Sequence, residues 1–295
     1  MSGRDWDRTD VRRQARLRRR RRVRRLGALV VLASLAALGV AGWTALDRRR
    51  EAAKAPPVST VPPTIPVTFP EGLRREEIAA ILEEKTNLSG QEYLSATAEG
   101  ALGQERAATK RPTSLEGYLF PATYEIGTET TVPYLVDRQL EAYDANVAGI
   151  DLKFAKSKNL TPYEVLIIAS MVEREVVVAS ERPLVAGVIY NRLRLRMRLD
   201  IDATVQYAVG DWEPLTGADL ASDSPYNTRK FPGLPPGPIA NPGVASIKAA
   251  ARPKASNFLY YVAREDGTNR HYFATSIDQF EQLKAKARAN AAATP

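Results

Sequence analysis

The feature that most restricts the fold of this chain is an apolar helical segment interrupted by charges, residues 164–182. Its sequence, EVLIIASMVEREVVVASER, surrounds Glu173, Arg174 and Glu175 with apolar side chains that would point in every direction around a helix axis. None of the three has an opposite charge three or four residues away. A buried charge destabilises the fold unless it is paired or neutralised, and it is otherwise kept for a role in binding or catalysis. These side chains therefore need partners from elsewhere in the fold, or they line a cleft.

Charge and composition limit the chemistry that a site can use. The net charge of the 295 residues is +8, but twelve arginines and three aspartates give residues 1–25 a charge of +9, so the remainder sums to −1. The high isoelectric point therefore says nothing about a ligand of the globular part. The absence of cysteine and the single histidine, His271, exclude a thiolate or multi-histidine metal centre. No metal and no other cofactor is expected, and His271 is interpreted as a packed structural residue.

An uncharged run of 21 residues, 26–46, predicts a transmembrane helix. The arginine-rich tail 1–25 is expected to stay in the cytoplasm, which makes the chain a single-pass protein of the cytoplasmic (inner) membrane with residues 47–295 outside. The first alternative is a cleaved signal peptide, whose apolar run is usually shorter. The second is a nucleic-acid-binding arm. Because the arginines adjoin the apolar run, anionic lipid is favoured and no nucleic-acid partner is expected.

The rest of the chain divides by composition and periodicity into an α+β arrangement. The predicted parts are a proline-rich linker (47–66), a small strand–helix–helix–strand module (67–128), a mixed helical and β domain (129–285) and a polar tail (286–295). Within the domain, residues 232–243 (PGLPPGPIANPG) contain five prolines and three glycines. This composition excludes helix and central strand. It predicts a rigid loop that presents backbone groups to a ligand, or a tight connector.

Local signals also predict individual elements. An amphipathic pattern predicts a helix over residues 74–85, and Ser89 is the expected cap of a second short helix. Thr161 and Pro162 are expected to open the helix that contains Glu173. Two short segments, 257–263 and 271–274, are expected to form a hairpin around the turn EDGTN.

Several segments taken together resemble the membrane-anchored endolytic murein transglycosylases of the YceG-like type. The matching pieces are LEGYLFPATYEI (115–126), IIASMVEREVVVASERPLVAGVIYNRLR (167–194), LDIDATVQYAVG (199–210), SPYNTRKFPGLPPGPIANPGVASIKAA (224–250) and NFLYYVAREDG (257–267). The resemblance implies one membrane span, a LysM-like module and a catalytic transglycosylase domain. It also implies peptidoglycan glycan strands as substrate and association with penicillin-binding synthases. Ala203 departs from the family pattern, which has proline there.

The resemblance places the catalytic acid on Glu173, whereas the chemistry of the residues alone leaves Glu173 and Glu175 as alternatives. Glycosidic cleavage needs a carboxyl group that is protonated near neutral pH. Leu166, Ala169 and Val177 are expected to form an apolar pocket that favours this protonated form.

Three polar residues are candidates for binding substrate around the acid: Gln206, Tyr226 and Asn227. Tyr226 and Asn227 could equally be turn residues. The alternative for Glu173 itself is a buried structural ion pair with Arg182 or Arg192.

The implied reaction is cleavage of the β-1,4 bond between N-acetylmuramic acid and N-acetylglucosamine. The muramic 6-hydroxyl would attack C1, so the product is a 1,6-anhydro sugar and no water is consumed. One alternative is a hydrolase of the same glycan, with Asp200 or Asp202 as a second carboxylate. The other is a non-catalytic module that binds glycan or scaffolds synthases.

Overall fold

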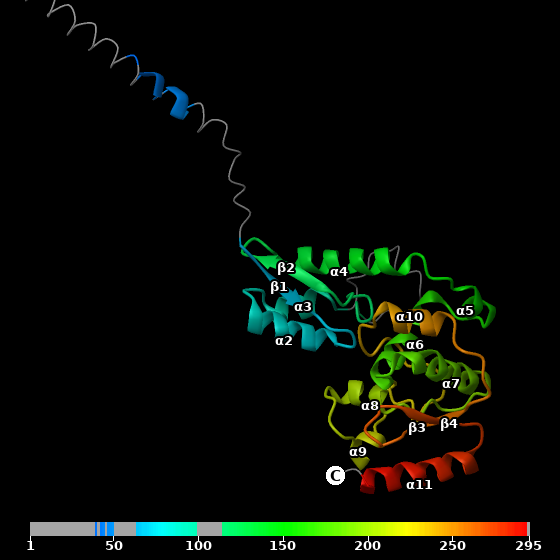
Figure 1. The fold of residues 1–295 in the computed structure, drawn as a ribbon. Coiled ribbons are helices and arrows are strands. Elements are labelled where there is room, and N and C mark those ends of the chain that lie inside the picture. Colours follow the sequence, from blue (N-terminus) through cyan, green and yellow to red (C-terminus); the bar gives the residue numbers. More distant parts are fainter. Residues whose placement is uncertain (1–38, 40–41, 45, 50–62, 99–113, 294–295) are drawn as a thin grey trace, which may run out of the picture. The chain divides into compact units, whose positions relative to one another are not determined.

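The structure, a computed structural model, describes residues 39, 42–44, 46–49, 63–98 and 114–293. The predicted basic tail lies outside these residues, as do most of the predicted membrane span and of the linker. Within the described part of the chain, no helix is both long enough and apolar enough to cross a bilayer. From Pro62 onward the chain forms one compact unit, which contains all the labelled elements of Figure 1.

The first part of this unit has the predicted order of strand, two helices and strand. Its elements are β1 (Thr64–Thr68), α2 (Arg75–Lys85), α3 (Gly90–Ala96) and β2 (Thr123–Gly127), and β1 pairs with β2 in antiparallel fashion. Residues 64–127 are called the N-terminal module below. Its core contains the fully buried side chains of Phe69, Leu82, Tyr93 and Leu119. Thus the amphipathic pattern of α2 and the serine cap of α3 produce the helices that they predict.

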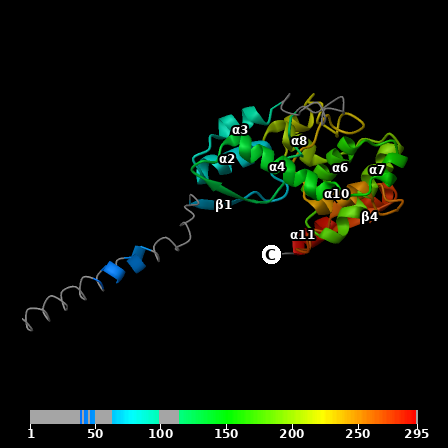
Figure 2. The same ribbon diagram turned by 90° about the horizontal axis from the view of Figure 1, so that it is seen from above.

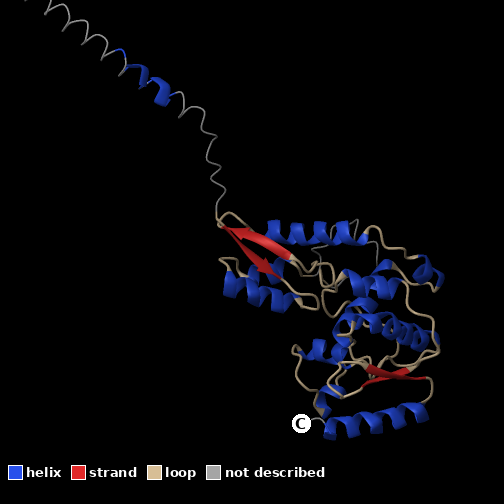
Figure 3. Cartoon of the chain, in the orientation of Figure 1, coloured by secondary structure: helices blue, strands red, loops and turns tan. Residues whose placement is uncertain are grey.

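The remainder is mainly helical, with one short hairpin (Figure 3). The helices are α4 (Val132–Val147), α5 (Lys153–Ser157), α6 (Pro162–Glu175), α7 (Arg182–Arg194), α8 (Asp202–Val209), α9 (Gly217–Leu220), α10 (Val244–Ala251) and α11 (Ile277–Ala293). The hairpin strands β3 (Tyr260–Ala263) and β4 (His271–Ala274) pair where the sequence predicts them. α4 packs against α3 of the N-terminal module (Figure 2). The α+β class is therefore confirmed for the described residues.

Helix α6 lies at the centre of the larger core and packs against α7 and α10. It begins with a capping box, because the Thr161 hydroxyl accepts from the Glu164 backbone N–H and the Glu164 carboxylate accepts from the Thr161 backbone N–H. The charged apolar segment 164–182 is not one continuous helix, however. Val176 is extended and buried, and a 3₁₀ turn over Ala179–Glu181 leads into α7. A run of three β-branched valines favours this extended exit.

Candidate active site

Glu173 lies in the last turn of α6 and is held from two directions. Its Oε1 accepts from Arg182 Nη2 at 3.2 Å, and its Oε2 accepts from the Gly243 backbone N–H at 3.0 Å. Arg182 is the first residue of α7, and Gly243 immediately precedes α10. The Glu173 side chain is 6% exposed. The carboxyl group is therefore fixed where three helices meet, and the end of loop 232–243 supplies one of its donors.

The turn between β1 and α2 packs directly against this carboxyl group. A Cβ atom at Gly72 would lie 3.6 Å from Glu173 Cγ, and Arg174 Nη1 donates to the Gly72 carbonyl at 3.1 Å. A Cβ atom at Gly243 would lie only 1.7 Å from Glu71 Oε1. Residues 71–72 of the N-terminal module therefore form part of the wall around Glu173.

The side chain of Asn241 joins the N-terminal module to loop 232–243. Its Oδ1 accepts from the backbone N–H groups of Gly117 (2.8 Å) and Leu119 (3.0 Å). Its Nδ2 donates to the Leu73 carbonyl (3.0 Å) and to Glu116 Oε1 (2.7 Å). All four hydrogen-bonding positions of this buried amide are used. Asn241 and these four partners are called the Asn241 junction below.

Glu116 is a buried carboxyl group within this junction. Its Oε2 accepts from the Arg75 backbone N–H at 3.2 Å, and the Tyr207 hydroxyl lies 3.5 Å away. Burial raises the pKa of Glu116 to about 8, although the Arg75 N–H and the nearby arginine charges oppose the shift.

The stability of the protein is expected to depend on the protonation of Glu116. Between its ordinary pKa of 4.5 and about 8, the folded protein keeps the proton that the unfolded chain has released. The free energy of unfolding should therefore fall as the pH rises through this window, by about 1.4 kcal/mol per pH unit. Glu116→Gln cannot ionise and should flatten this slope in urea unfolding measured across the window. The exposed Glu129→Gln variant is the control, and an unchanged slope in Glu116→Gln would contradict the assignment.

The prediction of an apolar pocket around Glu173 is wrong. Leu166 and Ala169 are buried in the core, but Val177 lies beyond the end of α6 and is 72% exposed. The groups that contact the Glu173 carboxylate are instead a guanidinium and a backbone amide. Of the two predicted ion-pair partners, Arg182 is the one observed. Arg192 is buried and donates to Asp200 at 3.0 Å and to the Leu199 carbonyl at 2.7 Å.

The three predicted substrate-binding residues lie on α8 and on the loop that precedes residues 232–243. The amide of Gln206 donates to the carbonyls of Trp212 (3.1 Å) and Glu213 (2.9 Å). Asn227 is fully buried, and its amide donates to two backbone carbonyls of residues 220 and 222. Tyr226 is half-buried, and the centroid of its ring lies 4.9 Å from the centroid of the Tyr207 ring. Gln206 and Asn227 thus hold loops in place, while Tyr226 is only partly buried.

The other acidic candidates have partners away from Glu173. Asp202 accepts from Arg229 at 2.6 Å, and Asp200 is paired with Arg192. Glu175 accepts from the Tyr261 hydroxyl at 2.9 Å, and burial raises its pKa. His271 is packed as predicted, with Nδ1 2.8 Å from Glu181 Oε2.

Sequence reasoning missed Glu71, Glu116 and Asn241. Glu116 and Asn241 lie within segments that carry the family resemblance, LEGYLFPATYEI and PGLPPGPIANPG, so their motifs offered a signal. Glu71 stands between Pro70 and Gly72 in a short turn, and nothing in the pattern indicates that this turn reaches Glu173.

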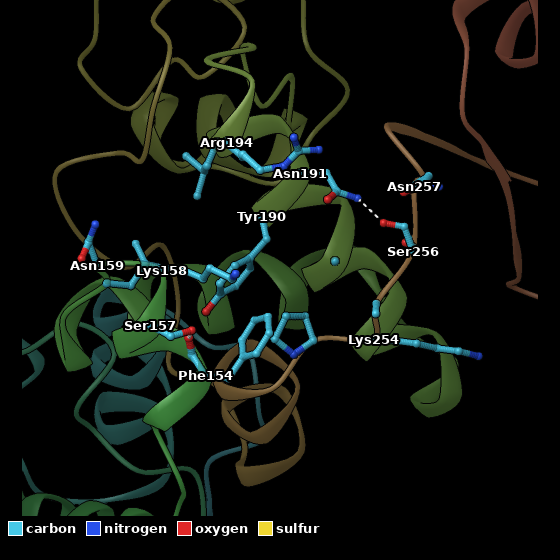
Figure 4. A pocket seen from close by; sticks show the side chains of 15 residues that line it. Phe154, Ser157, Lys158, Asn159, Tyr190, Asn191, Arg194, Lys254, Ser256 and Asn257 are labelled. Carbon is cyan, nitrogen blue, oxygen red and sulfur yellow. Dashed lines mark hydrogen bonds between the residues drawn. The ribbon is translucent and has the colours of Figure 1, made fainter.

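A cavity of about 880 Å³ lies elsewhere, between α5, α7 and residues 253–257 (Figure 4). Phe154 and Tyr190 line it, together with Lys158, Arg194 and Lys254. None of its lining residues carries a carboxyl group, so it has no acid for glycosidic cleavage.

Fold and site together define an α+β protein with one buried glutamate held by an arginine and a loop amide. The chain belongs to the YceG-like family, whose model matches residues 42–286. It is 37% identical over 224 residues to an endolytic murein transglycosylase of Streptococcus pneumoniae (strain ATCC BAA-255 / R6), covering 67% of this chain and 40% of that one. It is 34% identical over 236 residues to an endolytic murein transglycosylase of Bacillus subtilis (strain 168), covering 75% of this chain and 64% of that one.

A solved structure also resembles this fold. The crystal structure of a yceG-like protein from Listeria monocytogenes superposes with a TM-score of 0.66 at 32% identity, covering 76% of this chain and 77% of that one. The chain spans less than two thirds of the length of the curated relatives above, 40% and 64%.

Proposed function

We propose that this chain is an endolytic murein transglycosylase with Glu173 as its catalytic acid. It would cleave the bond between N-acetylmuramic acid and N-acetylglucosamine inside glycan strands and leave 1,6-anhydromuramic ends. The observation that carries the proposal is the fixed position of the Glu173 carboxyl group between Arg182 and the Gly243 N–H. The names of the pneumococcal and Bacillus relatives support the same activity.

In the proposed mechanism, Glu173 first gives its proton to the oxygen that links the two sugars. The carboxylate that remains is stabilised by the Arg182 guanidinium and the Gly243 N–H, both of which favour a negative charge. This carboxylate then takes the proton of the muramic 6-hydroxyl as that oxygen bonds to C1. The proton lost in the first step is regained in the second, so one carboxyl group serves as acid and then as base.

We propose that the wall of the substrate cleft combines loop 232–243 with the surface around Tyr226. Tyr226 packs on Tyr207, and because both residues are only partly buried the pair would offer an aromatic face to a sugar ring. Gln206 and Asn227 would contribute to substrate binding by fixing the neighbouring loops at residues 212–213 and 220–222 through their backbone contacts.

We propose that the enzyme is a single-pass protein of the cytoplasmic membrane, anchored by residues 26–46 with its N-terminus inside. The uncharged run and the adjoining arginines support this topology. In this proposal residues 67–128 are a LysM-like module, residues 129–285 are the catalytic domain, and the partners are nascent glycan strands and penicillin-binding synthases.

Mass analysis of digested murein sacculi tests the proposed reaction. The expected products carry anhydro ends, which are lighter by one water than the reducing ends that a hydrolase leaves. Products with reducing ends would overturn the transglycosylase assignment in favour of hydrolysis. An absence of any cleavage by the folded full-length chain would favour a non-catalytic glycan-binding role.

A further inference from the structure

We propose that Glu71, contributed by the N-terminal module, is a second carboxyl group of the active site and is electrostatically coupled to Glu173. The inference rests on the proposed role of Glu173 as the acid. It assigns the N-terminal module a direct part in the chemistry of the site.

The two carboxyl groups are close together, because they lie on either side of Gly243. The Gly243 N–H donates to Glu173 Oε2 at 3.0 Å, and the Cβ position of Gly243 lies 1.7 Å from Glu71 Oε1. With ordinary bond lengths within Gly243, the two carboxylate oxygens are separated by at most about 7 Å.

The turn that carries Glu71 is fixed. The Gly72 N–H donates to the Asn241 carbonyl at 2.8 Å, and the Gly72 carbonyl accepts from Arg174 Nη1 at 3.1 Å. Gly72 has a φ of +86°, which favours glycine at this position. Both peptide groups of Gly72 are therefore tied to the larger domain, and the turn brings Glu71 to Glu173.

The charges around Glu71 link it to Glu173. The charged groups that act on Glu71 are Glu173 from α6 and Arg182 from the start of α7, and Arg174 is bound to the adjacent carbonyl. Glu71 is exposed overall, but partial burial of its carboxyl group raises its pKa, the Glu173 charge raises it further, and Arg182 opposes the shift. One guanidinium can offset one of the two carboxylates but not both. A negative charge on one of the two carboxyl groups therefore disfavours a negative charge on the other.

This coupling resolves a conflict at Glu173. A catalytic acid must hold a proton near neutral pH, yet Arg182 and the Gly243 N–H both favour the ionised form. The predicted apolar pocket is not present to oppose them. The negative charge of Glu71 supplies the opposing effect, since it favours retention of one proton by the pair.

The pH dependence of sacculus cleavage by the full chain tests the coupling. Glu71→Gln removes the charge and keeps the shape of the side chain. The alkaline limb of the pH–rate profile is expected to move to lower pH by about one unit, which is roughly a tenfold loss of rate where that limb descends. The loss of rate should become smaller towards acidic pH, and the product should still carry the anhydro end. Glu71→Asp should retain most of the wild-type profile, and Glu84→Gln, an exposed glutamate of α2, is the matched control.

A second variant displaces the Glu71 carboxylate without replacing it. Gly243 has a φ of −77°, which alanine adopts without strain, so the new methyl of Gly243→Ala would push the flexible end of Glu71 aside. Its profile should shift in the same direction, and the double variant with Glu71→Gln should show no further shift.

Two results would overturn the inference. One is a wild-type profile in Glu71→Gln, and the other is a loss of rate that is equal at every pH and accompanied by a lower melting temperature. If Glu173→Gln is inactive in the same assay, either result rejects only the coupling between Glu71 and Glu173, and the proposed function stands. If Glu173→Gln is fully active, the proposed function itself is rejected.

Discussion

Glu173→Gln is expected to lower the rate of murein cleavage by about a thousandfold or more, because an amide cannot give a proton to the glycosidic oxygen. The substitution keeps the size of the side chain. One of its two terminal atoms becomes an N–H donor that faces Arg182 or the Gly243 N–H, which would cost about 1–3 kcal/mol of stability. Cleavage of purified sacculi and the urea midpoint, measured on the same preparation, separate the catalytic loss from this smaller structural effect.

Glu175→Gln is the matched control, since Glu175 is two residues away on α6 and binds Tyr261. It should keep cleavage within a few-fold of wild type. A Glu173→Gln protein that cleaves at the normal rate would show that Glu173 is only a structural partner of Arg182. Inactivation by Glu175→Gln alone would transfer the role of acid to Glu175.

Asn241→Ala is expected to give the largest loss of stability among simple truncations at the site, about 3–6 kcal/mol. The buried N–H groups of Gly117 and Leu119 lose their partner. The Leu73 carbonyl and Glu116 each lose one donor but keep a backbone N–H, from Asn241 and Arg75 respectively. Each unsatisfied buried polar group costs about 1–3 kcal/mol, although relaxation and entering water reduce the sum. Cleavage should fall as well, because the junction positions the Gly243 N–H and the turn that carries Glu71.

Urea unfolding of Asn241→Ala against Asn146→Ala measures this contribution. Asn146 is exposed on α4 and makes one local hydrogen bond, to the Ala142 carbonyl. If the two variants were equally stable, the Asn241 junction would contribute nothing beyond a surface asparagine. The attachment of the N-terminal module would then have to depend on other contacts.

Local features of the fold could be predicted because neighbouring residues determine them. Thr161 and Pro162 define the start of α6, Ser89 caps α3, and the hairpin strands fall at residues 257–274 as expected. The end of α6 could not be placed, because the exit at Val176 depends on the core that buries this valine. The assignment of Glu173 as the proposed acid depended on the family resemblance, since the residues alone did not distinguish Glu173 from Glu175.

The surroundings of the acid could not be predicted, because they come from distant parts of the chain. Choosing between Arg182 and Arg192 as the partner of Glu173 requires knowing that Arg192 is taken by Asp200. The approach of Glu71 depends on a hydrogen bond between Gly72 and Asn241, which are far apart in the sequence. Hydrophobic periodicity carries no information about such contacts.

The close approach of Glu71 to the α-carbon of Gly243 has a consequence for sequence variation. The space that a side chain at position 243 would need is already taken by the carboxylate at position 71. Homologous chains should therefore accept alanine or serine at position 243 chiefly where position 71 is a shorter residue, so the two positions should covary.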